Sequence, residues 1–494
     1  MFNFKYYLEK IGEIGYVEQV TGSIAYVRGL PKARPQELIV FESGQIGQVF
    51  SLSYDYVEVL ILSNVSVAVS SRATRTGELF TVAVGEELLG KMLSPLGLPV
   101  EGEELEPSLE RRPIDVKPLG IKQRKNIDEP FETGVTIVDL VVPLGKGQRE
   151  LVVGDRKTNK TQFLLQVILT QAQKGTICIY AGIGKRVLDI KMVGDFFKKN
   201  AILSNTIIVA SSASDPAGLV FLTPYTAMTI AEFFRDRGKD VLVVFDDLTA
   251  HAKYYREITL LAKRFPGRSS YPGDIFYIHS KLLERGGNFS LISKDARGKL
   301  EKKEVAITCL PVGELVLGDL SGYIQTNLMA MTDGHIFFDR EYFNEGRRPA
   351  VNPFLSVTRV GRQAQSPLAR ELSRQLISFL VKHEKLKQFL HFGAELSEET
   401  RRTLAQGEKI VGFFEQSSDK IIPLPINIFI LACIWAGFWK ELETVEAKRK
   451  MEDLRSRYLK DSSLKQKVDS FLINYKDFSE LVGYLKANGD TLFS

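Results

Sequence analysis

The pattern of apolar and polar positions divides the chain into three parts. From about residue 10 to 80, short alternating runs such as SIAYVRGL and YVEVLIL are separated by turn residues, which predicts a small β-barrel domain over residues 1–80. Residues 81–365 alternate near-continuous apolar strands (TICIYA, NTIIVA and VLVVF) with helical stretches, which predicts a parallel α/β sheet covered on both faces. Residues 366–494 are helical and charged, which predicts a C-terminal α-helical bundle.

Three segments within this frame have unusual compositions. Gly286–Glu304 is polar and glycine-rich, so we expect a mobile surface loop there. Ile426–Trp439 is apolar like a membrane helix, but it is too short to span a bilayer and follows two prolines, which favours a buried helix of the bundle. Lys440–Lys460 mixes acidic residues among its Lys and Arg, which favours a solvated helix face over a nucleic-acid patch.

Composition places the chain among ordinary globular proteins. Its 494 residues are 44% hydrophobic and 25% charged, and a net charge of +5 over this length is weak evidence for a nucleic-acid partner. The cysteines Cys178, Cys309 and Cys433 lie far apart, so we expect buried free thiols in a reducing compartment and no disulfide or zinc set. Met1–Glu18 lacks the apolar core of a signal peptide, so no export is indicated.

A candidate phosphate-binding loop occupies Leu151–Thr161, LVVGDRKTNKT. It reads as a strand that ends at a glycine, a short loop, and Lys160-Thr161 opening a helix, close to the P-loop pattern G-x-x-x-x-G-K-[ST]. Backbone N–H groups and the helix dipole would then face the phosphates. Lys160 would reach the terminal phosphates, and the Thr161 hydroxyl would hold Mg²⁺.

One position of this loop departs from the pattern, because Asn159 stands where a second glycine is required. Asparagine tolerates a positive φ at a cost of roughly 1–2 kcal/mol, so the loop can still form. The near-match alone does not distinguish a true P-loop from a chance occurrence, and the context has to decide.

The strand VLVVF ends in Asp246-Asp247. A carboxylate at this end of such a strand is where a P-loop protein would hold Mg²⁺ through water, and the alternative is a helix N-cap. We assign the metal role to Asp246 and the cap role to Asp247, since a helical run begins near Ala250.

Four ordered segments identify the family that the chain resembles. They are GQRELVVGDRKTNKT (Gly147–Thr161), EFFRDRGKDVLVVFDDLT (Glu232–Thr249), PGDIFYIHSKLLER (Pro272–Arg285) and RPAVNPFLSVTRVGRQAQ (Arg348–Gln365). Together they resemble the alpha subunits of F-type ATP synthases over nearly the full chain. The resemblance implies a multidomain fold with an N-terminal β-barrel, a central α/β P-loop (RecA-like) nucleotide-binding domain and a C-terminal α-helical bundle.

The resemblance also implies partners, ligands and a location. In that family alpha and beta subunits alternate in a hetero-hexamer around a gamma shaft, and a delta subunit or peripheral stalk is a possible further partner. The complex couples ATP synthesis or hydrolysis to proton or sodium flow as a peripheral membrane complex on the cytoplasmic face of the bacterial inner membrane, or the equivalent organelle face. The ligands are ATP or ADP with Mg²⁺. No nucleic acid is expected, and the membrane is reached only through the ion-translocating sector.

The residue at position 185 indicates a noncatalytic subunit. Similar catalytic subunits carry, in a G-x-G-E-R segment, a glutamate that orients the attacking water. Here the segment is Ala181–Arg186, AGIGKR, and Lys185 takes that place. A protonated lysine accepts no proton, so the chain should bind Mg-ATP without turning it over. Alpha subunits usually show glutamine here, so Lys185 is a departure within the family, and it is a candidate phosphate ligand.

The catalytic contribution implied by the resemblance is Arg359, in the segment SVTRVG. It would be an arginine finger that reaches into the adjacent beta site, with Ser356–Thr358 setting its position. A guanidinium suits this task because it is planar, permanently charged and able to bind two phosphate oxygens. The alternative is an ordinary interface salt bridge.

The expected nucleotide-binding residues come from the P-loop and from an adenine pocket. They are Gly154, Asp155, Arg156, Lys157, Thr158, Asn159, Lys160, Thr161, Arg348, Pro349 and Gln416, with Thr161 and Asp246 for the metal. Ser418 stands where the family pattern has a second glutamine.

Two further hypotheses remain open from the sequence. Family members usually begin with an extra helix that binds the peripheral stalk, whereas this sequence starts almost directly at the barrel. Together with Asn159 and Lys185, this admits an alpha-like subunit of a divergent rotary ATPase that is not used for ATP synthesis. The other hypothesis is a related hexameric translocase or secretion ATPase, which would need its own catalytic glutamate.

Overall fold

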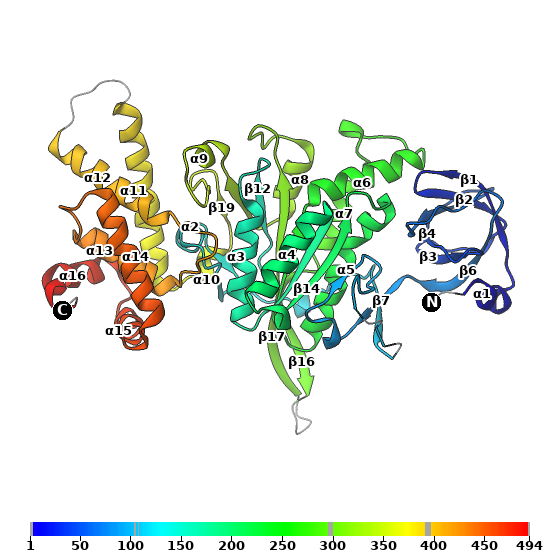
Figure 1. Ribbon diagram of the computed structural model, residues 1–494, viewed down its shortest axis with the longest axis horizontal. Helices are drawn as coiled ribbons and strands as arrows, with labels where there is room; N and C mark the ends of the chain where they lie inside the picture. Colours follow the sequence, from blue (N-terminus) through cyan, green and yellow to red (C-terminus); the bar gives the residue numbers. More distant parts are fainter. Residues whose placement is uncertain (1–2, 103–104, 107, 295–299, 391–396, 493–494) are drawn as a thin grey trace. The chain divides into compact units, whose positions relative to one another are not determined.

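The computed structural model describes residues 3–102, 105–106, 108–294, 300–390 and 397–492. The chain forms two compact units. The first comprises residues 1–125, 172–314 and 320–332, and the second comprises residues 126–171, 315–319 and 333–494. Figure 1 shows the elements within each unit.

A closed six-stranded barrel forms the N-terminal part of the first unit. Its strands follow the order β1-β2-β5-β4-β3-β6, and β6 pairs back onto β1. The strands are β1 (Gly15–Thr21), β2 (Ile24–Arg28), β3 (Glu37–Phe41), β4 (Ile46–Leu52), β5 (Val57–Ile61) and β6 (Arg72–Leu79). Helix α1 (Phe4–Ile11) precedes them and ends at Gly12, whose φ of 69° suits a glycine.

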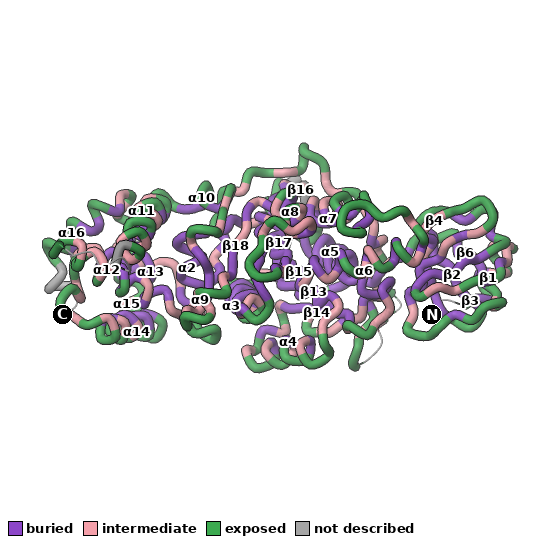
Figure 2. The backbone as a smooth tube through the Cα atoms, turned by 90° about the horizontal axis from the view of Figure 1, so that it is seen from above, coloured by how far each residue is buried: buried purple, intermediate pink, exposed green. Residues whose placement is uncertain are grey.

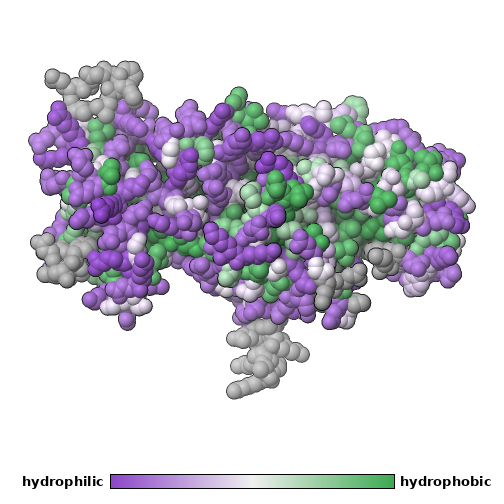
Figure 3. Space-filling view, viewed as in Figure 1, coloured by the Kyte–Doolittle hydropathy of each residue, from purple (hydrophilic) through white to green (hydrophobic). Residues whose placement is uncertain are grey.

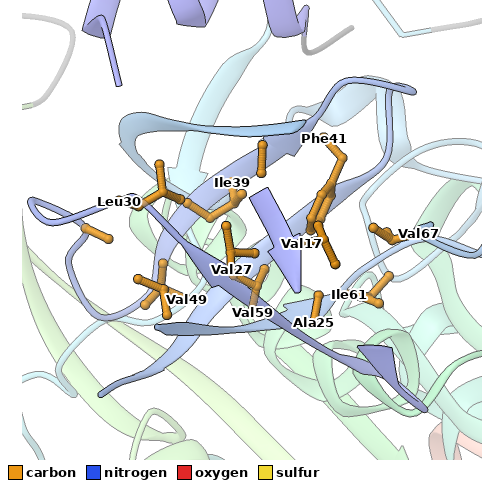
Figure 4. Close-up of a cluster of buried hydrophobic side chains, with 13 residues drawn as sticks. Val17, Ala25, Val27, Leu30, Ile39, Phe41, Val49, Val59, Ile61 and Val67 are labelled. Carbon is orange, nitrogen blue, oxygen red and sulfur yellow. The ribbon is translucent and has the colours of Figure 1, made fainter. Parts of the chain in front are cut away.

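Apolar side chains fill the barrel because the alternation along each strand sends one set of residues inward. Val27, Ile39, Phe41 and Val59 are fully buried in this core, and Figure 4 shows these side chains, from β2, β3 and β5, inside the barrel. The predicted barrel is therefore confirmed.

A parallel sheet forms the rest of the first unit. Its strand order is β17-β15-β13-β14-β8. The bounds are β8 (Met92–Leu93), β13 (Ile177–Lys185), β14 (Thr206–Ser212), β15 (Val241–Asp246) and β17 (Leu300–Glu314), with a separate pair β7 (Thr81–Val84) and β9 (Glu110–Pro113). Strands β13, β14 and β15 are the three apolar runs predicted from the sequence, and they are buried almost throughout.

The helices of this unit are α4 (Val187–Lys199), α5 (Ala217–Asp236), α6 (Leu248–Leu261), α7 (Ile275–Leu283) and α8 (Tyr323–Met331), with 3₁₀ turns η1 (Glu86–Leu88), η2 (Ile121–Gln123), η3 (Leu203–Asn205) and η4 (Arg268–Ser270). Of the described helices, only α5 has the length and hydropathy of a membrane span. Its apolar window is 94% buried, and Figure 2 shows it as a buried element, so it is a core helix of this unit.

The expectation of a loop at Gly286–Glu304 is wrong for the described residues of that segment. Strand β16 (Gly287–Lys294) pairs antiparallel with β17, from Gly287 opposite Ile307 to Lys294 opposite Leu300. Phe289 lies opposite Val305, and both side chains are buried, so this apolar pair anchors the ribbon. The polar sequence of this segment misled the prediction, because Lys302, Lys303 and Glu304 of β17 are exposed and interrupt the apolar alternation expected of a strand. Residues 295–299 lie outside the described residues.

The second unit contains the P-loop strand and the C-terminal helices. Strand β12 (Glu150–Gly154) pairs parallel with β18 (Gly334–Phe338), and β19 (Val357–Thr358) pairs antiparallel with β18. The shorter elements are β10 (Pro130–Phe131), β11 (Leu144–Gly145), α2 (Thr136–Val141), α9 (Arg340–Asn344) and α10 (Gly361–Ala364), and α3 (Lys160–Gln173) starts from this unit.

The C-terminal part is helical, as predicted. Its helices are α11 (Pro367–Leu390), α12 (Glu398–Phe414), α13 (Leu424–Ala436), α14 (Thr444–Lys460), α15 (Ser462–Ile473) and α16 (Phe478–Leu492). The apolar run predicted to be a buried helix is α13, which packs against α15 and α16. These helices present a mostly hydrophilic surface in Figure 3. The predicted architecture of barrel, α/β domain and helical bundle is thus confirmed.

Candidate functional site

The P-loop follows strand β12 with the backbone that the sequence predicts. A Cβ on Gly154 would lie 2.5 Å from the Phe338 carbonyl oxygen, so only glycine fits where the strand passes β18. Lys157 and Asn159 adopt φ values of 63° and 66°. The expected left-handed conformation of Asn159 is therefore present. Such alternation of backbone conformation directs successive N–H groups to one side and produces an anion-binding concavity.

The side chains of the loop hold it in this shape. The Thr158 hydroxyl donates to the Asp155 carbonyl (2.8 Å), and the Lys160 ammonium donates to the carbonyls of Gly154 (2.7 Å) and Asp155 (2.5 Å). The Asp155 carboxylate accepts from the Gly318 N–H (3.0 Å). Phosphate oxygens are charged acceptors and stronger partners for an ammonium than neutral carbonyls, so Lys160 can transfer to a bound nucleotide.

The outer surface of the loop is open to solvent. Arg156, Lys157 and Thr161 are exposed, and Asn159 and Lys160 are half-buried. The Thr161 hydroxyl lies in the first turn of α3, where a phosphate-bound cation would find an oxygen ligand. The residues present therefore fit a nucleotide.

In the first unit, Asp246 ends strand β15 and is engaged by two side chains. The Lys185 ammonium lies 2.6 Å from one carboxylate oxygen, and the Tyr180 hydroxyl donates to the other over 2.7 Å. Tyr180 and Lys185 belong to β13, the neighbouring parallel strand, in which Gly182 lies opposite Asp246. The pair is largely buried, with the Asp246 side chain 3% exposed and that of Lys185 23% exposed.

Lys185 is protonated in this environment. Burial lowers the pKa of its ammonium, but attraction by Asp246 and Asp247 and the hydrogen bond to Asp246 outweigh burial and leave the pKa raised. An ammonium has donors and no acceptor, so it cannot orient a water molecule for attack as a carboxylate does.

The cap role expected for Asp247 is confirmed. Its carboxylate accepts from the N–H groups of Thr249 (2.6 Å) and Ala250 (3.3 Å) at the start of α6. The metal role expected for Asp246 stays a prediction; in this structure its two carboxylate oxygens accept from the Lys185 ammonium and the Tyr180 hydroxyl. Among the described residues, no group of three or more His, Cys, Asp or Glu side chains is placed to hold a metal ion.

Sequence reasoning missed Tyr180 and the Lys185–Asp246 pair. A usable signal existed, because the carboxyl ends of adjacent parallel strands meet at one edge of a sheet. A lysine at the end of one strand and an aspartate at the end of the next were therefore candidates for pairing.

Arg359 is presented on the surface of the second unit by a short and well-anchored segment. Its side chain is exposed, and its N–H donates to the Asp333 carbonyl (3.0 Å). Immediately before it, the Thr358 hydroxyl donates to the Pro143 carbonyl (2.9 Å) and accepts from the Gly361 N–H (3.1 Å). These bonds fix the backbone on either side of the arginine, while no ion pair to a described residue holds its guanidinium.

Glu150, which the sequence analysis did not single out, lies buried near Arg359. One of its oxygens accepts from the Gln148 amide (2.6 Å), and the other, Oε1, is buried without a hydrogen-bond partner. Burial raises the pKa of Glu150 well above its ordinary value, against lowering contributions from Gln148 and Arg359. The sequence around Glu150 in β12 did not indicate that its carboxylate would be buried near Arg359.

The residues expected for an adenine pocket lie together in the second unit. The Gln416 N–H donates to the Arg348 carbonyl (2.7 Å), and the Arg348 guanidinium stacks 3.7 Å from the Phe343 ring centroid. The Gln416 amide oxygen accepts from the N–H (2.9 Å) and hydroxyl (3.0 Å) of Thr136, and its amide nitrogen donates to the carbonyls of Gly134 and Lys420. This side chain is buried and holds α2 beside the Arg348-Pro349 segment.

Comparison with known proteins agrees with this geometry. Residues 134–358 match the ATP synthase alpha/beta family, nucleotide-binding domain, and residues 365–480 match the C-terminal domain of the ATP synthase alpha/beta chain. Similar proteins are the ATP synthase subunits alpha of Staphylococcus aureus strains JH9 and JH1. Each is 37% identical over 445 residues, which cover 90% of this chain and 87% of the relative. The chain therefore belongs to the ATP synthase alpha/beta family, as an alpha-type subunit of an F-type ATP synthase.

Proposed function

We propose that this chain is a noncatalytic subunit that binds ATP or ADP at Gly154–Thr161 and supplies Arg359 to the catalytic site of an adjacent beta subunit. The observation that carries the proposal is Lys185, a protonated side chain paired with Asp246 where a catalytic subunit needs a carboxylate. Bound ATP would not be hydrolysed, because no group at this position activates water.

Each binding residue has a distinct task in this proposal. Backbone N–H groups from Asp155 to Lys160 surround the phosphates, the Lys160 ammonium moves onto the terminal phosphate oxygens, and the Thr161 hydroxyl contacts a phosphate-bound Mg²⁺ when one is present. The exposed side chains of Arg156 and Lys157 add positive charge at the loop.

The adenine would lie against Arg348 and Pro349. Gln416 contributes by holding their backbone, because its own amide is already engaged by four hydrogen bonds. A direct bond from Gln416 to the base would require one of these bonds to break.

The assembly proposed is an alternating alpha–beta ring around a gamma shaft, with a delta or peripheral-stalk contact, on the cytoplasmic face of a bacterial inner membrane or the equivalent organelle face. Arg359 supports the ring, because an exposed guanidinium on a fixed backbone is available to a neighbouring subunit. We place the domain boundaries near residues 80 and 365, since β6 ends at Leu79 and α11 begins at Pro367.

The purified full chain tests the noncatalytic part of this proposal. Calorimetry should detect ATP binding that is lost in Lys160→Ala and kept in the control Lys191→Ala, which removes an exposed lysine of α4. Phosphate release should stay at the background rate. Steady ATP hydrolysis that Lys160→Ala abolishes would show that the chain is catalytic.

A further inference from the structure

The carboxyl group of Glu150 lies beside the strand that separates it from the Arg359 segment. In the sheet of the second unit, Gly334 of β18 lies opposite Glu150 of β12 on one side and opposite Thr358 of β19 on the other. A Cβ on Gly334 would lie 2.8 Å from both carboxylate oxygens of Glu150, so the carboxyl group packs directly against this glycine. The missing side chain at position 334 therefore leaves room for Glu150 to lean toward β19.

Gln148 links this carboxyl group to the residue that precedes Arg359. Its amide nitrogen donates to Glu150 Oε2 (2.6 Å) and to the Thr358 hydroxyl (3.3 Å), and its amide oxygen accepts from the Gly145 N–H (2.8 Å). An amide nitrogen has two hydrogens, and both are engaged by these contacts. Gln148 therefore has no further donor for the second oxygen of Glu150.

Glu150 Oε1 and the Arg359 guanidinium each lack a partner among the described residues. Glu150 is fully buried and nothing described donates to its Oε1, while Arg359 is exposed and forms no ion pair with a described residue. The two groups are complementary, because a guanidinium has only donors and a carboxylate only acceptors. They also lie close enough to interact: burial and Asp333 raise the pKa of Glu150, and Gln148 and Arg359 oppose this rise.

The other charged groups near Glu150 are already engaged in the part of the chain that the structure describes. Asp333, which precedes β18, is paired with the guanidinium of Arg149 over 3.0 and 3.2 Å. His335 Nε2 lies 2.8 Å from a backbone carbonyl oxygen, and burial and Arg359 lower the pKa of this ring, so it is neutral at pH 7. Arg359 is therefore the cation available to neutralise Glu150.

The charge of Glu150 then depends on where the guanidinium points. A buried carboxylate without a counter-charge is strongly disfavoured, so the carboxyl group holds a proton while the guanidinium extends into solvent. When the guanidinium turns back onto Oε1, the proton leaves to solvent and a carboxylate–guanidinium pair forms. The guanidinium keeps its own charge in both arrangements.

We propose that Glu150 is a positioning residue for Arg359: it binds the guanidinium when Arg359 turns away from the neighbouring subunit, and on taking up a proton it releases the guanidinium for the reaction there. The inference rests on the proposed function, since that function gives Arg359 its reaction. It makes delivery of the arginine sensitive to pH. As the pH rises, the ionised carboxyl group competes with the phosphoryl group for Arg359.

Thermal unfolding of the full chain, without any partner, tests the pairing. At pH 9, Arg359→Ala should lower the melting temperature of wild type more than that of Glu150→Gln, because only a carboxylate loses a counter-charge. At pH 6 the carboxyl group of Glu150 is protonated, so Arg359→Ala should have the same effect in both backgrounds. Equal effects at pH 9 as well would overturn the inference.

Steady-state ATP hydrolysis by the ring reconstituted with beta and gamma subunits tests the consequence. Between pH 7 and 9, the rate of Glu150→Gln relative to wild type should rise at least about threefold, because the variant has no carboxylate to hold Arg359. Glu150→Met, a second uncharged side chain of similar length, should show the same rise. The control Glu399→Gln, which changes an exposed residue of α12, should keep a constant ratio to wild type. A constant ratio for the Glu150 variants would overturn the proposal.

The two experiments separate this inference from the proposed function. If the Arg359→Ala ring keeps the wild-type rate, the arginine-finger role is wrong, and the melting comparison still decides whether Glu150 and Arg359 pair. If Arg359→Ala slows the ring but the Glu150 variants keep a constant ratio to wild type, Arg359 retains its role and the positioning role of Glu150 is wrong.

Discussion

At the scale of single residues, we propose that two positions distinguish this nucleotide-binding domain from a catalytic one. Lys185 puts an ammonium where water activation needs an acceptor, and Asn159 puts a side chain where the P-loop pattern has glycine. On this proposal, Lys185 leaves no group that can orient the attacking water, and Asn159 places a side chain where phosphate approaches the backbone. The loop nevertheless keeps its shape, with Asn159 at a φ of 66°.

We expect Asn159→Gly to bind nucleotide more tightly than wild type, by about fivefold if removing the side chain next to the phosphate gains about 1 kcal/mol. Glycine adopts the left-handed conformation without cost and leaves more room for phosphate. Asn159→Ala is the matched control, because alanine keeps a Cβ and tolerates positive φ less well than asparagine. Calorimetry should order the affinities Gly, Asn, Ala, and wild-type binding equal to or tighter than the glycine variant would contradict this account.

At the scale of elements, helices α5, α6 and α7 meet around a buried histidine pair. His251 Nε2 lies 3.0 Å from the Phe221 carbonyl, and His251 Nδ1 lies 3.0 Å from His279 Nε2. A carbonyl only accepts, so we assign the proton of His251 to Nε2, and His279 Nε2 then donates to Nδ1. Both rings are neutral in this arrangement, and a further proton would place two donors face to face.

This pair predicts that the first unit loses stability on acidification. Burial lowers the pKa of His251 to about 4 from the ordinary value of 6.5, and burial and His251 lower that of His279 well below it. Between pH 6.5 and 4 the unfolded chain therefore binds more protons than the folded one, so stability falls as the pH falls through this window. His251 alone should lower the free energy of unfolding by about 2 kcal/mol between pH 7 and 5.

Denaturant titrations of the full chain at pH 7 and pH 5 measure this loss. The double variant His251→Gln/His279→Gln removes both titrating groups, so its transition should shift less between the two pH values than that of wild type. An equal shift would assign the acid sensitivity to other groups.

The secondary-structure elements also show which parts of the fold could be predicted from the sequence. The strands β13, β14 and β15, helix α13 and the Asp247 cap follow from local patterns, because burial on both faces and N-cap chemistry leave clear signals. The β16–β17 ribbon was missed because Lys302, Lys303 and Glu304 of β17 are exposed and interrupt the apolar alternation that predicts a strand. Glu150 and the Tyr180–Asp246 contact were missed because pairing across strands depends on register, which a single sequence does not state.

At the scale of the whole molecule, the proposal gives this chain one part of a reaction that is completed in a neighbouring subunit. We propose that the P-loop and the Arg348–Gln416 segment of the second unit hold a nucleotide, and that Arg359 acts in the reaction of a neighbouring subunit. The family match covers both the nucleotide-binding and the C-terminal domains. On our proposal, nucleotide binding and the contribution to catalysis in the neighbouring subunit involve separate residues of one polypeptide.

The central claim is that Arg359 acts on the γ-phosphoryl group bound by a neighbouring subunit. An arginine supplied in this way is worth about 10³–10⁵ in rate, or about 4–7 kcal/mol of barrier, whereas a surface salt bridge contributes about 0–1 kcal/mol. Substitution of Arg359 should therefore slow hydrolysis far more if the residue is an arginine finger than if it forms a surface salt bridge. Lysine keeps the charge but loses the planar fork, so Arg359→Lys should recover little of the rate.

Steady-state ATP hydrolysis by the ring reconstituted with beta and gamma subunits measures this most directly. Arg359→Ala and Arg359→Lys should assemble and bind ATP at the beta sites as wild type does, yet turn over at least about a hundredfold more slowly. Arg362→Ala, which removes another exposed arginine in α10, should keep the wild-type rate. If the Arg359→Ala ring hydrolyses ATP within a few-fold of wild type, Arg359 is an interface residue and the account is contradicted.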